Sequence, residues 1–324
     1  MGFLRVAISG LVAGLMFAQG LVCAVAALVA QGGRISARAD ILTHFAPFWL
    51  AGAVVVAAYA LLLAPRPLRT IFLTLGGVGA IAAGSLVLPE YVRPMSPRAP
   101  AGAPHQLKLV QFNVWGRNTD LSDTARWIVD QDPDVVVIEE ATPAIRDAIL
   151  QRRAYHVVCG KCQVMIFSKL PTIDSGVVDT PHGLPRPPIA RGAYHSASGD
   201  FTVVGTHYTW PTKGSLQQQQ GQRLAWILAQ YPKDAMILAG DFNSTPWSFS
   251  RRREDAMFGL ERRTRALFSW PAGEVSHERV KVPFPFLPID QVYAGKAWRT
   301  VSVKRGPRLG SDHYPVIVTL ARAP

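Results

Sequence analysis

The chain has 324 residues and a formal net charge of +12, and its composition changes along its length. The first 104 residues hold seven Lys or Arg and two acids, whereas the remainder has the mixed composition of a globular domain. A uniform soluble domain is therefore excluded, and the two parts are expected to have different structures. The positive charge alone does not show whether the binding partner is a nucleic acid, a phosphate-bearing substrate or an anionic lipid surface.

Three apolar stretches occupy most of the first part, over residues 3–30, 41–63 and 68–88. Each is long enough to cross a bilayer, because about 20 apolar residues span a hydrocarbon core of about 30 Å. We therefore predict a membrane anchor over residues 1–88 with three transmembrane helices. The Arg residues divide almost evenly between the two sides of these spans, so the positive-inside rule leaves the orientation nearly tied.

Residues 89–104 are rich in proline and separate the predicted anchor from the rest of the chain. Proline lacks a backbone donor and clashes with the preceding helical turn, so we expect a semi-rigid spacer and no regular helix here. The predicted catalytic domain is then residues 105–324.

Strands and helices alternate along this domain, judged from apolar runs and apolar periodicity. The predicted strands cover residues 107–114, 134–138, 164–167, 191–195, 201–206, 235–239 and 315–320, and the predicted helices cover residues 119–130, 144–152 and 216–229. Interleaved helices and strands favour a layered α/β fold over an all-β barrel. The tract of four Gln residues at 217–220 is expected on a solvated face of the last helix.

Two of the three cysteines, Cys159 and Cys162, form an isolated Cys-Gly-Lys-Cys sequence. A structural zinc site is disfavoured because the sequence has no second pair of this kind. A local disulfide and two free thiols both remain open, and the redox state of the compartment decides between them.

Polar residues follow or precede the predicted strands at their ends. Because strand-end loops of one core converge on one rim, we expect these side chains to meet. The set is Asn113, Glu140, His207, Asp241, Asn243, Asp290, Asp312 and His313. Its oxygen ligands suit Mg²⁺ or Mn²⁺ better than zinc, and a magnesium ion held in this way keeps positions for phosphate oxygens. The pattern predicts metal-assisted hydrolysis of a phosphoester.

Six short motifs occur in a fixed order along the domain. They are Gln111-Phe112-Asn113-Val114-Trp115, residues 134–140, Gly205-Thr206-His207, Gly240-Asp241-Phe242-Asn243, Ile289-Asp290 and Ser311-Asp312-His313. This series resembles the endonuclease/exonuclease/phosphatase superfamily, which includes deoxyribonuclease I, apurinic endonucleases, sphingomyelinases and inositol-phosphate phosphatases. The resemblance covers essentially all of residues 105–322. It implies an α/β four-layer sandwich of two β-sheets flanked by helices, preceded here by the three transmembrane helices.

The resemblance implies that Glu140 is the principal metal ligand, helped by Asn113 and Asp312, with Mg²⁺ or Mn²⁺ as the cofactor. The residue before this Glu is often Gln in the family, whereas here it is Glu139. If Glu139 points to the other side of its strand, as successive residues do, its role is structural.

Five further residues carry catalytic roles by the same resemblance. Asp241 and Asn243 position the attacking water and the scissile phosphate, and His207 contacts the phosphate from the other side. Asp290 orients His313, which is a base or a donor to the phosphoryl oxygens. The general base is either an Asp or a His of this set.

Three other side chains are candidates for the rim of the site. Arg191 opens a predicted strand, where it either reaches the substrate phosphate or remains a solvated edge charge. His182 and His277 are candidates for the mouth of the substrate site.

The favoured function is hydrolysis of a phosphate mono- or diester at the membrane surface, such as a lipid-linked phosphate or pyrophosphate. A metal-dependent endo- or exonuclease is the alternative, since the domain is basic, and a catalytically inactive membrane scaffold is a third reading. Membrane-anchored branches of the superfamily include proteins linked to cell-envelope phosphate chemistry and glycopeptide resistance. That resemblance implies a bacterial inner or plasma membrane with an extracytoplasmic catalytic domain.

Overall fold

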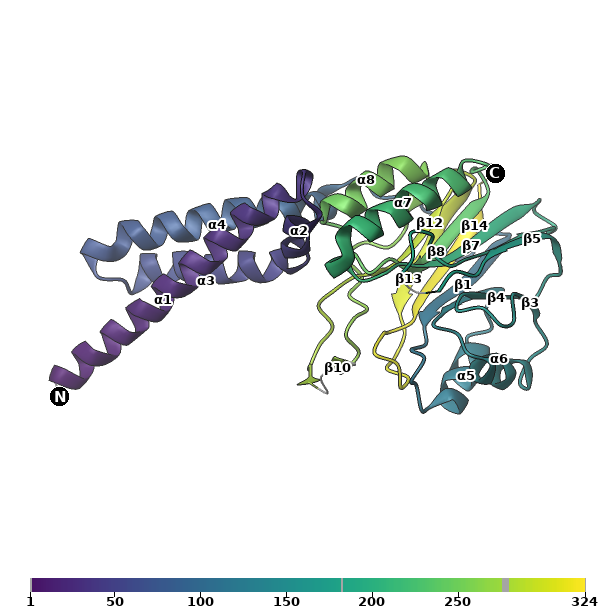
Figure 1. Ribbon diagram of the computed structural model, residues 1–324, viewed down its shortest axis with the longest axis horizontal. Helices are drawn as coiled ribbons and strands as arrows, with labels where there is room; N and C mark the ends of the chain where they lie inside the picture. The colour runs from purple at the N-terminus through teal and green to yellow at the C-terminus, as the bar shows by residue number, and fades with distance from the viewer. Residues whose placement is uncertain (1, 182, 276–279, 324) are drawn as a thin grey trace. The chain divides into compact units, whose positions relative to one another are not determined.

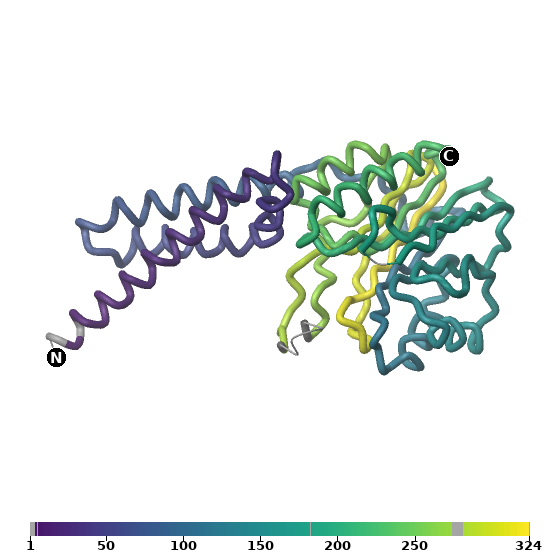
Figure 2. Tube along the Cα trace, viewed as in Figure 1, coloured from purple at the N-terminus to yellow at the C-terminus, as the bar shows by residue number. Residues whose placement is uncertain are grey.

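The structure is a computed structural model that describes residues 2–181, 183–275 and 280–323. The chain divides into two compact units. One unit contains residues 1–93 together with Trp247–Arg252, and the other contains Pro94–Pro246 and Arg253–Pro324. Figures 1 and 2 show the helices and strands of both units.

The first unit is built from long apolar helices. They are α1 (Gly2–Gln31), α3 (Ala46–Leu62) and α4 (Arg66–Val92), and the short α2 (Ala37–Asp40) and two 3-10 turns, Gly32–Arg34 and Ile41–Phe45, connect α1 to α3. Three segments, Val6–Arg34, Ala37–Leu62 and Arg66–Val92, are long and apolar enough to cross a membrane. This agrees with the three predicted spans.

Small residues let these helices pack closely. Gly76 and Gly79 of α4 lie so near Ala53 of α3 that a β-carbon at either glycine would approach it within 2.9 Å. Polar side chains add bonds between helices, because Gln19 donates to the Gly52 carbonyl at 3.1 Å and Gln31 donates to the Ala82 carbonyl at 2.8 Å. Close backbone approach and interhelical hydrogen bonds are the usual sources of helix association in a bilayer.

The segment Trp247–Arg252, which follows the Gly-Asp-Phe-Asn motif in the sequence, belongs to this first unit. The first turn of α8 (Phe249–Phe258) begins in it. The buried Asp40 carboxylate accepts the backbone N–H groups of Phe249 and Ser250, each at 2.8 Å. A carboxylate at this position satisfies amide groups that a helix start leaves unpaired.

Two boundaries differ from the sequence prediction. The helix α4 extends to Val92 and so includes the first four residues of the expected spacer. Pro89 is tolerated because it lies in the last turn, where it removes a single N–H bond, and Glu90 pairs there with Arg93 at 3.0 Å. The second span begins with the 3-10 turn Ile41–Phe45, and its α-helix starts at Ala46.

The second unit contains two six-stranded sheets and a small hairpin. The first sheet has the order β13 (Trp298–Arg305), β14 (Val316–Arg322), β1 (Gln106–Asn113), β2 (Val135–Glu139), β4 (Met165–Ser168) and β3 (His156–Val158). The second has the order β5 (Thr172–Val178), β6 (Ile189–Tyr194), β7 (Phe201–His207), β8 (Met236–Asp241), β12 (Asp290–Ala294) and β9 (Glu261–Arg262). The hairpin pairs β10 (Glu274–Val275) with β11 (Val280–Lys281).

Three buried clusters hold the layers of this unit together. The largest lies between the two sheets and includes Val137, Val203 and Val318. A second packs α5 (Leu121–Asp130) and α6 (Pro143–Leu150) on the outer face of the first sheet, and a third packs α7 (Gly214–Leu228) on the second sheet. Figure 1 shows the helices outside the two sheets. The predicted four-layer sandwich is confirmed.

Every predicted strand and helix of this domain has an observed counterpart, with boundaries shifted by a few residues. β12 and β13, among other strands, were not predicted. β12 has only five residues and follows Pro288. In β13 the polar residues Arg299, Ser302 and Lys304 interrupt the apolar residues. Apolar runs are therefore too weak a signal for these two strands.

Candidate functional site

Strand register brings the motifs to one end of the sandwich. Asn113 of β1 pairs with Glu139 of β2 in a parallel ladder, and His207 of β7 pairs with Asp241 of β8 in the same way. Asp290 then lies opposite Asp241 in the antiparallel β8 and β12 pair. Parallel strands end at the same edge, so residues far apart in the sequence share this rim.

Three residues at this rim have the left-handed backbone conformation that non-glycine residues rarely adopt. They are Trp115 with φ of 57°, Glu140 with φ of 50° and Asn243 with φ of 48°. Such residues cost free energy of about 1–3 kcal/mol each and cluster at functional sites. At Glu140 the turn redirects the chain, so that Glu139 stays buried in the strand while Glu140 lies at the half-buried rim.

Gly240 permits the close approach of β7 and β8 beside the site. A β-carbon at this position would lie 2.0 Å from the Thr206 carbonyl oxygen, so any other residue would separate the strands. The glycine of the Gly-Asp-Phe-Asn motif therefore has a steric role in placing Asp241 next to His207.

A buried chain of titratable groups forms one half of the site. Nδ1 of His313 lies 2.8 Å from Oδ2 of Asp290, and Nε2 of the same ring lies 3.6 Å from Oδ2 of Asp241. Nε2 of His207 lies 3.5 Å from that Asp241 oxygen. His313 therefore bridges two carboxylates, one that orients the ring and one that faces the cavity.

Burial and mutual charge set the pKa values in this chain. Burial raises the pKa of Asp241 to about 7, with a further increase from Asp290 and an opposing effect of His313. Burial would also raise the pKa of Asp290, but the His313 charge and hydrogen bond outweigh it and lower this pKa. Burial would lower the pKa of His313, but Asp290 and Asp241 raise it well above its usual value. Asp290 and His313 therefore form a buried ion pair, and Asp241 can exchange a proton near neutral pH.

Backbone and amide groups hold Asp241 in place. Its Oδ1 accepts the backbone N–H of Asn243 at 2.8 Å, and its Oδ2 accepts the Asn113 side-chain amide at 3.1 Å. The Asn243 amide also donates to the Tyr208 carbonyl at 2.9 Å. The loops after β1, β7 and β8 are therefore fastened to one another around this carboxylate.

The other half of the site is a pair of acids with less complete pairing. Glu140 accepts the Asn113 amide at 3.1 Å and the Gly116 N–H at 3.0 Å. Burial would raise the pKa of Glu140, but His207 and these donors lower it, so the group is ionised. Asp312 accepts the Trp270 indole N–H at 3.3 Å through Oδ2. In the described part of the chain, its buried Oδ1 has no hydrogen-bond partner.

An unpaired buried carboxylate oxygen is costly unless a cation meets it. Glu140 and Asp312 line one cavity, and the Asn113 side chain contacts Glu140. Together they offer the hard oxygen donors that Mg²⁺ and Mn²⁺ prefer. The residues present therefore fit a divalent cation. Asp241, Asp290 and His313 form a second buried group whose ligand atoms lie within 4.8 Å of one another. His313 is held there as an ion-pair partner, so we favour the first group as the cation site.

A cavity of about 240 Å³ opens over both halves. Its floor includes Glu140, Asp241, Asn243, Asp312 and His313, and its wall includes Trp115, Arg117 and Trp210. Trp210 packs edge-to-face on Trp270 with ring centroids 5.9 Å apart. The cavity therefore joins a polar floor to an aromatic and cationic rim.

The structure thus brings together the whole predicted set of Asn113, Glu140, His207, Asp241, Asn243, Asp290, Asp312 and His313. Arg191 does not join it, and the prediction that this side chain reaches the substrate phosphate is wrong. β6 begins at Ile189, so Arg191 lies inside the strand, where it pairs with Asp174 at 2.7 Å and stacks on Tyr231 at 4.3 Å. His182 and His277 lie outside the described residues.

Gln111 was not predicted as a site residue, yet it contacts two carboxyl groups behind the site. Its amide donates to Glu139 and to Asp290, each at 2.8 Å. Burial and the neighbouring Asp290 raise the pKa of Glu139 well above its usual value, which favours the neutral form of this second carboxyl. The buried position of Glu139 agrees with the expected alternation along the strand.

The expectation of a solvated face for the four Gln residues is wrong at two of them. Gln217 and Gln220 are buried, whereas Gln218 and Gln219 are exposed. The signal was available, because residues 217 and 220 share one helical face with Leu224 and Leu228.

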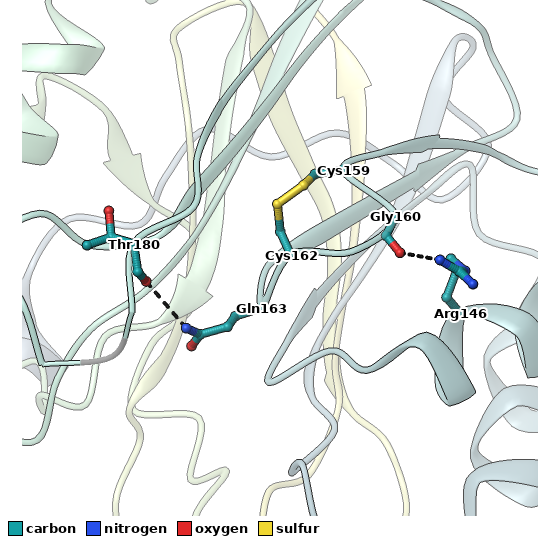
Figure 3. The surroundings of a disulfide bond; sticks show 6 residues. All are labelled: Arg146, Cys159, Gly160, Cys162, Gln163 and Thr180. Carbon is teal, nitrogen blue, oxygen red and sulfur yellow. Dashed lines mark hydrogen bonds between the residues drawn. A yellow bond between two sulfur atoms is a disulfide. The ribbon is translucent and has the colours of Figure 1, made fainter.

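Cys159 and Cys162 form a disulfide with their Cα atoms 5.5 Å apart (Figure 3). The turn that they close is tied to α6, since Arg146 donates to the Gly160 carbonyl at 2.5 Å. The next residue, Gln163, accepts the backbone N–H of Ala141 at 2.9 Å. The disulfide therefore lies beside the loop that carries Glu140.

Comparison with known proteins gives one family match. Residues 110–313 match the model of the Endonuclease/Exonuclease/phosphatase family. No curated protein sequence matches the chain.

Solved structures share the fold at low sequence identity. A humanized D. rerio TDP2 is 18% identical with a TM-score of 0.52, and the match covers 66% of this chain and 98% of that one. A Bacteroides thetaiotaomicron mannosyl-6-phosphatase is 15% identical with a TM-score of 0.54, and the match covers 66% of this chain and 99% of that one. An endonuclease/exonuclease/phosphatase from Beutenbergia cavernae is 20% identical with a TM-score of 0.51, and the match covers 68% of this chain and 72% of that one.

Proposed function

The chain belongs to the Endonuclease/Exonuclease/phosphatase family, a superfamily of metal-dependent phosphoesterases and nucleases, and on this premise we propose that it is a membrane-anchored phosphoester hydrolase dependent on Mg²⁺ or Mn²⁺. The observation that carries the proposal is the pairing of two different half-sites over one cavity. His313 and Asp241, which are buried and linked to Asp290, line the same cavity as the acids Glu140 and Asp312.

The reaction is attack of water on phosphorus, with cleavage of the bond to the leaving oxygen. Asp241 lies at the cavity floor with a pKa of about 7, so its ionised form can accept the proton of the attacking water. Asn243 orients this carboxylate through its N–H, and its own side chain helps to hold the phosphate. The charged His313 donates a hydrogen bond to a phosphoryl oxygen, and His207 approaches the phosphate from the other side of Asp241.

Glu140, Asn113 and Asp312 would hold the divalent cation, which when bound offsets negative charge on the phosphate. Asp290 keeps His313 protonated and fixes its ring orientation through the bond to Nδ1. Gln111 in turn fixes Asp290 from the opposite side. Each of these residues is preorganised by hydrogen bonds before substrate binds.

We propose a small phosphoester as the substrate, such as a lipid-linked phosphate or pyrophosphate at the membrane surface. The three apolar helices support a position at a bilayer, and the mannosyl-6-phosphatase is a relative by fold whose name describes a phosphomonoester substrate. The Cys159 and Cys162 disulfide supports an extracytoplasmic catalytic domain, since such bonds persist in oxidising compartments.

The test is phosphate release by the purified full-length chain in detergent, with Mg²⁺ and with a panel of lipid phosphates, a lipid pyrophosphate and soluble phosphomonoesters. We expect turnover in the wild type and loss of it in Asp241→Ala and His313→Ala. His195→Ala is the matched control, because this exposed histidine pairs with Asp200 at 2.6 Å. Full activity in both site variants would refute the proposed site.

A nuclease is the second candidate, favoured by one comparison. A D. rerio TDP2 that shares the fold was solved with a single-strand DNA product, at 18% identity and a TM-score of 0.53. Plasmid nicking and single-strand cleavage at low salt, falling steeply as salt rises, would support this candidate. Phosphate release from lipid substrates without any cleavage of nucleic acid at low salt would exclude it.

A further inference from the structure

The helix α7 carries two buried glutamines that reach the loops of the candidate site. Gln217 is 3% exposed and Gln220 is 1% exposed, and neither belongs to the set of catalytic or metal residues. A buried amide needs several partners, so the identity of those partners shows what the side chain holds in place.

Gln217 donates its side-chain amide to three backbone carbonyls in two separate loops. The acceptors are Thr209 at 3.0 Å, in the loop after β7, and Phe242 and Asn243 at 3.2 Å each, in the loop after β8. The first loop follows His207 and carries Trp210, and the second follows Asp241 and carries Asn243. A single side chain therefore contacts both loops that deliver these residues.

Gln220 also binds the loop after β7. Its Oε1 accepts the Thr209 backbone N–H at 2.9 Å, so the two glutamines bind both backbone polar groups of Thr209. Its amide donates to the Leu184 carbonyl at 2.7 Å. Tyr208 and Asp241 also bond directly, from N–H to carbonyl at 2.9 Å, so the loops and the helix form one connected network.

We propose that Gln217 and Gln220 form a glutamine clamp that positions the two catalytic loops against each other. The clamp touches neither the substrate nor the cation, and it acts through the backbone of Thr209, Phe242 and Asn243. Its catalytic consequence rests on the proposed function, because it sets the separation of His207 from Asp241 and the place of Trp210 on the cavity wall. Small displacements of this kind reduce catalytic rates by roughly a hundredfold for about 1 Å.

The tract supplies matched controls one residue away. Gln218 and Gln219 lie on the same helix, have the same chemistry and are exposed. We expect Gln217→Leu to lower kcat by roughly tenfold or more, with a smaller change in KM, whereas Gln218→Leu leaves both within about twofold. A wild-type kcat in a folded Gln217→Leu variant would overturn the proposal.

A second variant guards against a folding defect. In Gln217→Glu the introduced carboxyl group can donate to a carbonyl only when protonated, and when ionised it repels the three carbonyl oxygens. The ratio of the variant kcat to the wild-type kcat should therefore fall as pH rises, since burial favours the protonated form but does not abolish ionisation. The ratio for Gln218→Glu should stay flat. Equal and flat ratios for both variants would contradict the clamp.

Amide hydrogen exchange separates the clamp from the proposed reaction. In Gln217→Leu, residues 207–210 and 241–245 should exchange faster than in the wild type, and in Gln218→Leu they should not. If the wild type hydrolyses no phosphoester, the proposed function fails, and the exchange comparison still decides the clamp. Unchanged exchange in Gln217→Leu would refute the clamp even in an active enzyme.

Discussion

The two halves of the candidate site differ in how fully their polar atoms are paired. Asp290, His313 and Asp241 are all buried and bonded to one another or to fixed amides. By contrast, Glu140 is half-buried at the rim, and Asp312 leaves a buried oxygen without a partner among the described residues.

This difference indicates which half of the site keeps its geometry without a bound cation. The linked residues Asp290, His313 and Asp241 are held in place by contacts within the protein, so their geometry should persist without a cation. The half around Glu140 and Asp312 gathers negative charge that protein donors only partly offset, so its stability should depend on a bound cation. The variants below separate these two behaviours.

The largest effect on activity is expected at the half of the site formed by Asp290, His313 and Asp241. His313→Ala removes the donor to the phosphate and leaves Asp290 buried without its partner, so kcat should fall by about a thousandfold. Extra metal should not restore it. Steady-state phosphate release across a Mg²⁺ series is the measurement, with His195→Ala as the control. Recovery of His313→Ala at high Mg²⁺ would show that the two halves are not distinct.

A large but rescuable effect is expected at the other half. Glu140→Gln keeps the shape of the side chain and removes its charge, so the apparent affinity for Mg²⁺ should fall by roughly a hundredfold. Activity should return in part as Mg²⁺ is raised. Asp123→Asn, on the exposed surface beside Arg126, should leave the Mg²⁺ dependence unchanged. A Glu140→Gln variant with a low kcat and an unshifted Mg²⁺ dependence would argue against a ligand role.

A moderate effect on activity is expected at Gln111, which contacts Asp290. Gln111→Ala removes the donor shared by Asp290 and Glu139 and leaves both carboxyls less well paired, so kcat should fall by about tenfold. Gln151→Ala, on the exposed end of α6, is the control. Wild-type kinetics in Gln111→Ala would mean that His313 and its contacts alone orient Asp290.

The smallest effect is on stability. The pKa of Asp241 is raised from its usual value of 3.8 to about 7, so the folded protein favours the protonated carboxyl. Between those pH values the unfolded chain loses the proton first, and stability falls as pH rises. Asp241→Asn removes this penalty, so it should stabilise the cation-free protein above pH 7, and the gain should vanish below pH 4. Thermal unfolding in EDTA at the two pH values measures this difference.

Much of the site could be predicted because its residues follow strands with strong local signals. The runs ending at Asn113, Glu140 and Asp241 are apolar and short. A polar residue that directly follows a buried strand lies at the strand end, close to the other strand-end residues. Asp290 was identified from its motif, although its strand was missed, because β12 has five residues and its partners are far along the chain.

Residues whose role depends on packing between distant elements could not be placed in the same way. The bond from Gln111 to Asp290 crosses 179 positions, and no local pattern encodes it. Arg191 was expected at the start of a strand, whereas β6 begins at Ile189 and the contacts of this side chain are with Asp174 and Tyr231, which lie far from it in the sequence. The buried Gln217 and Gln220 had a helical-face signal, but polar residues on such a face suggest solvent until their acceptors are known.

Calorimetric titration with Mn²⁺ tests the central claim most directly. We expect the wild type to bind the cation and a Glu140→Ala, Asp312→Ala double variant to lose that binding, while His313→Ala retains it. Wild-type binding heat in the double variant, or no binding in the wild type, would contradict the assignment of the cation to this half of the site.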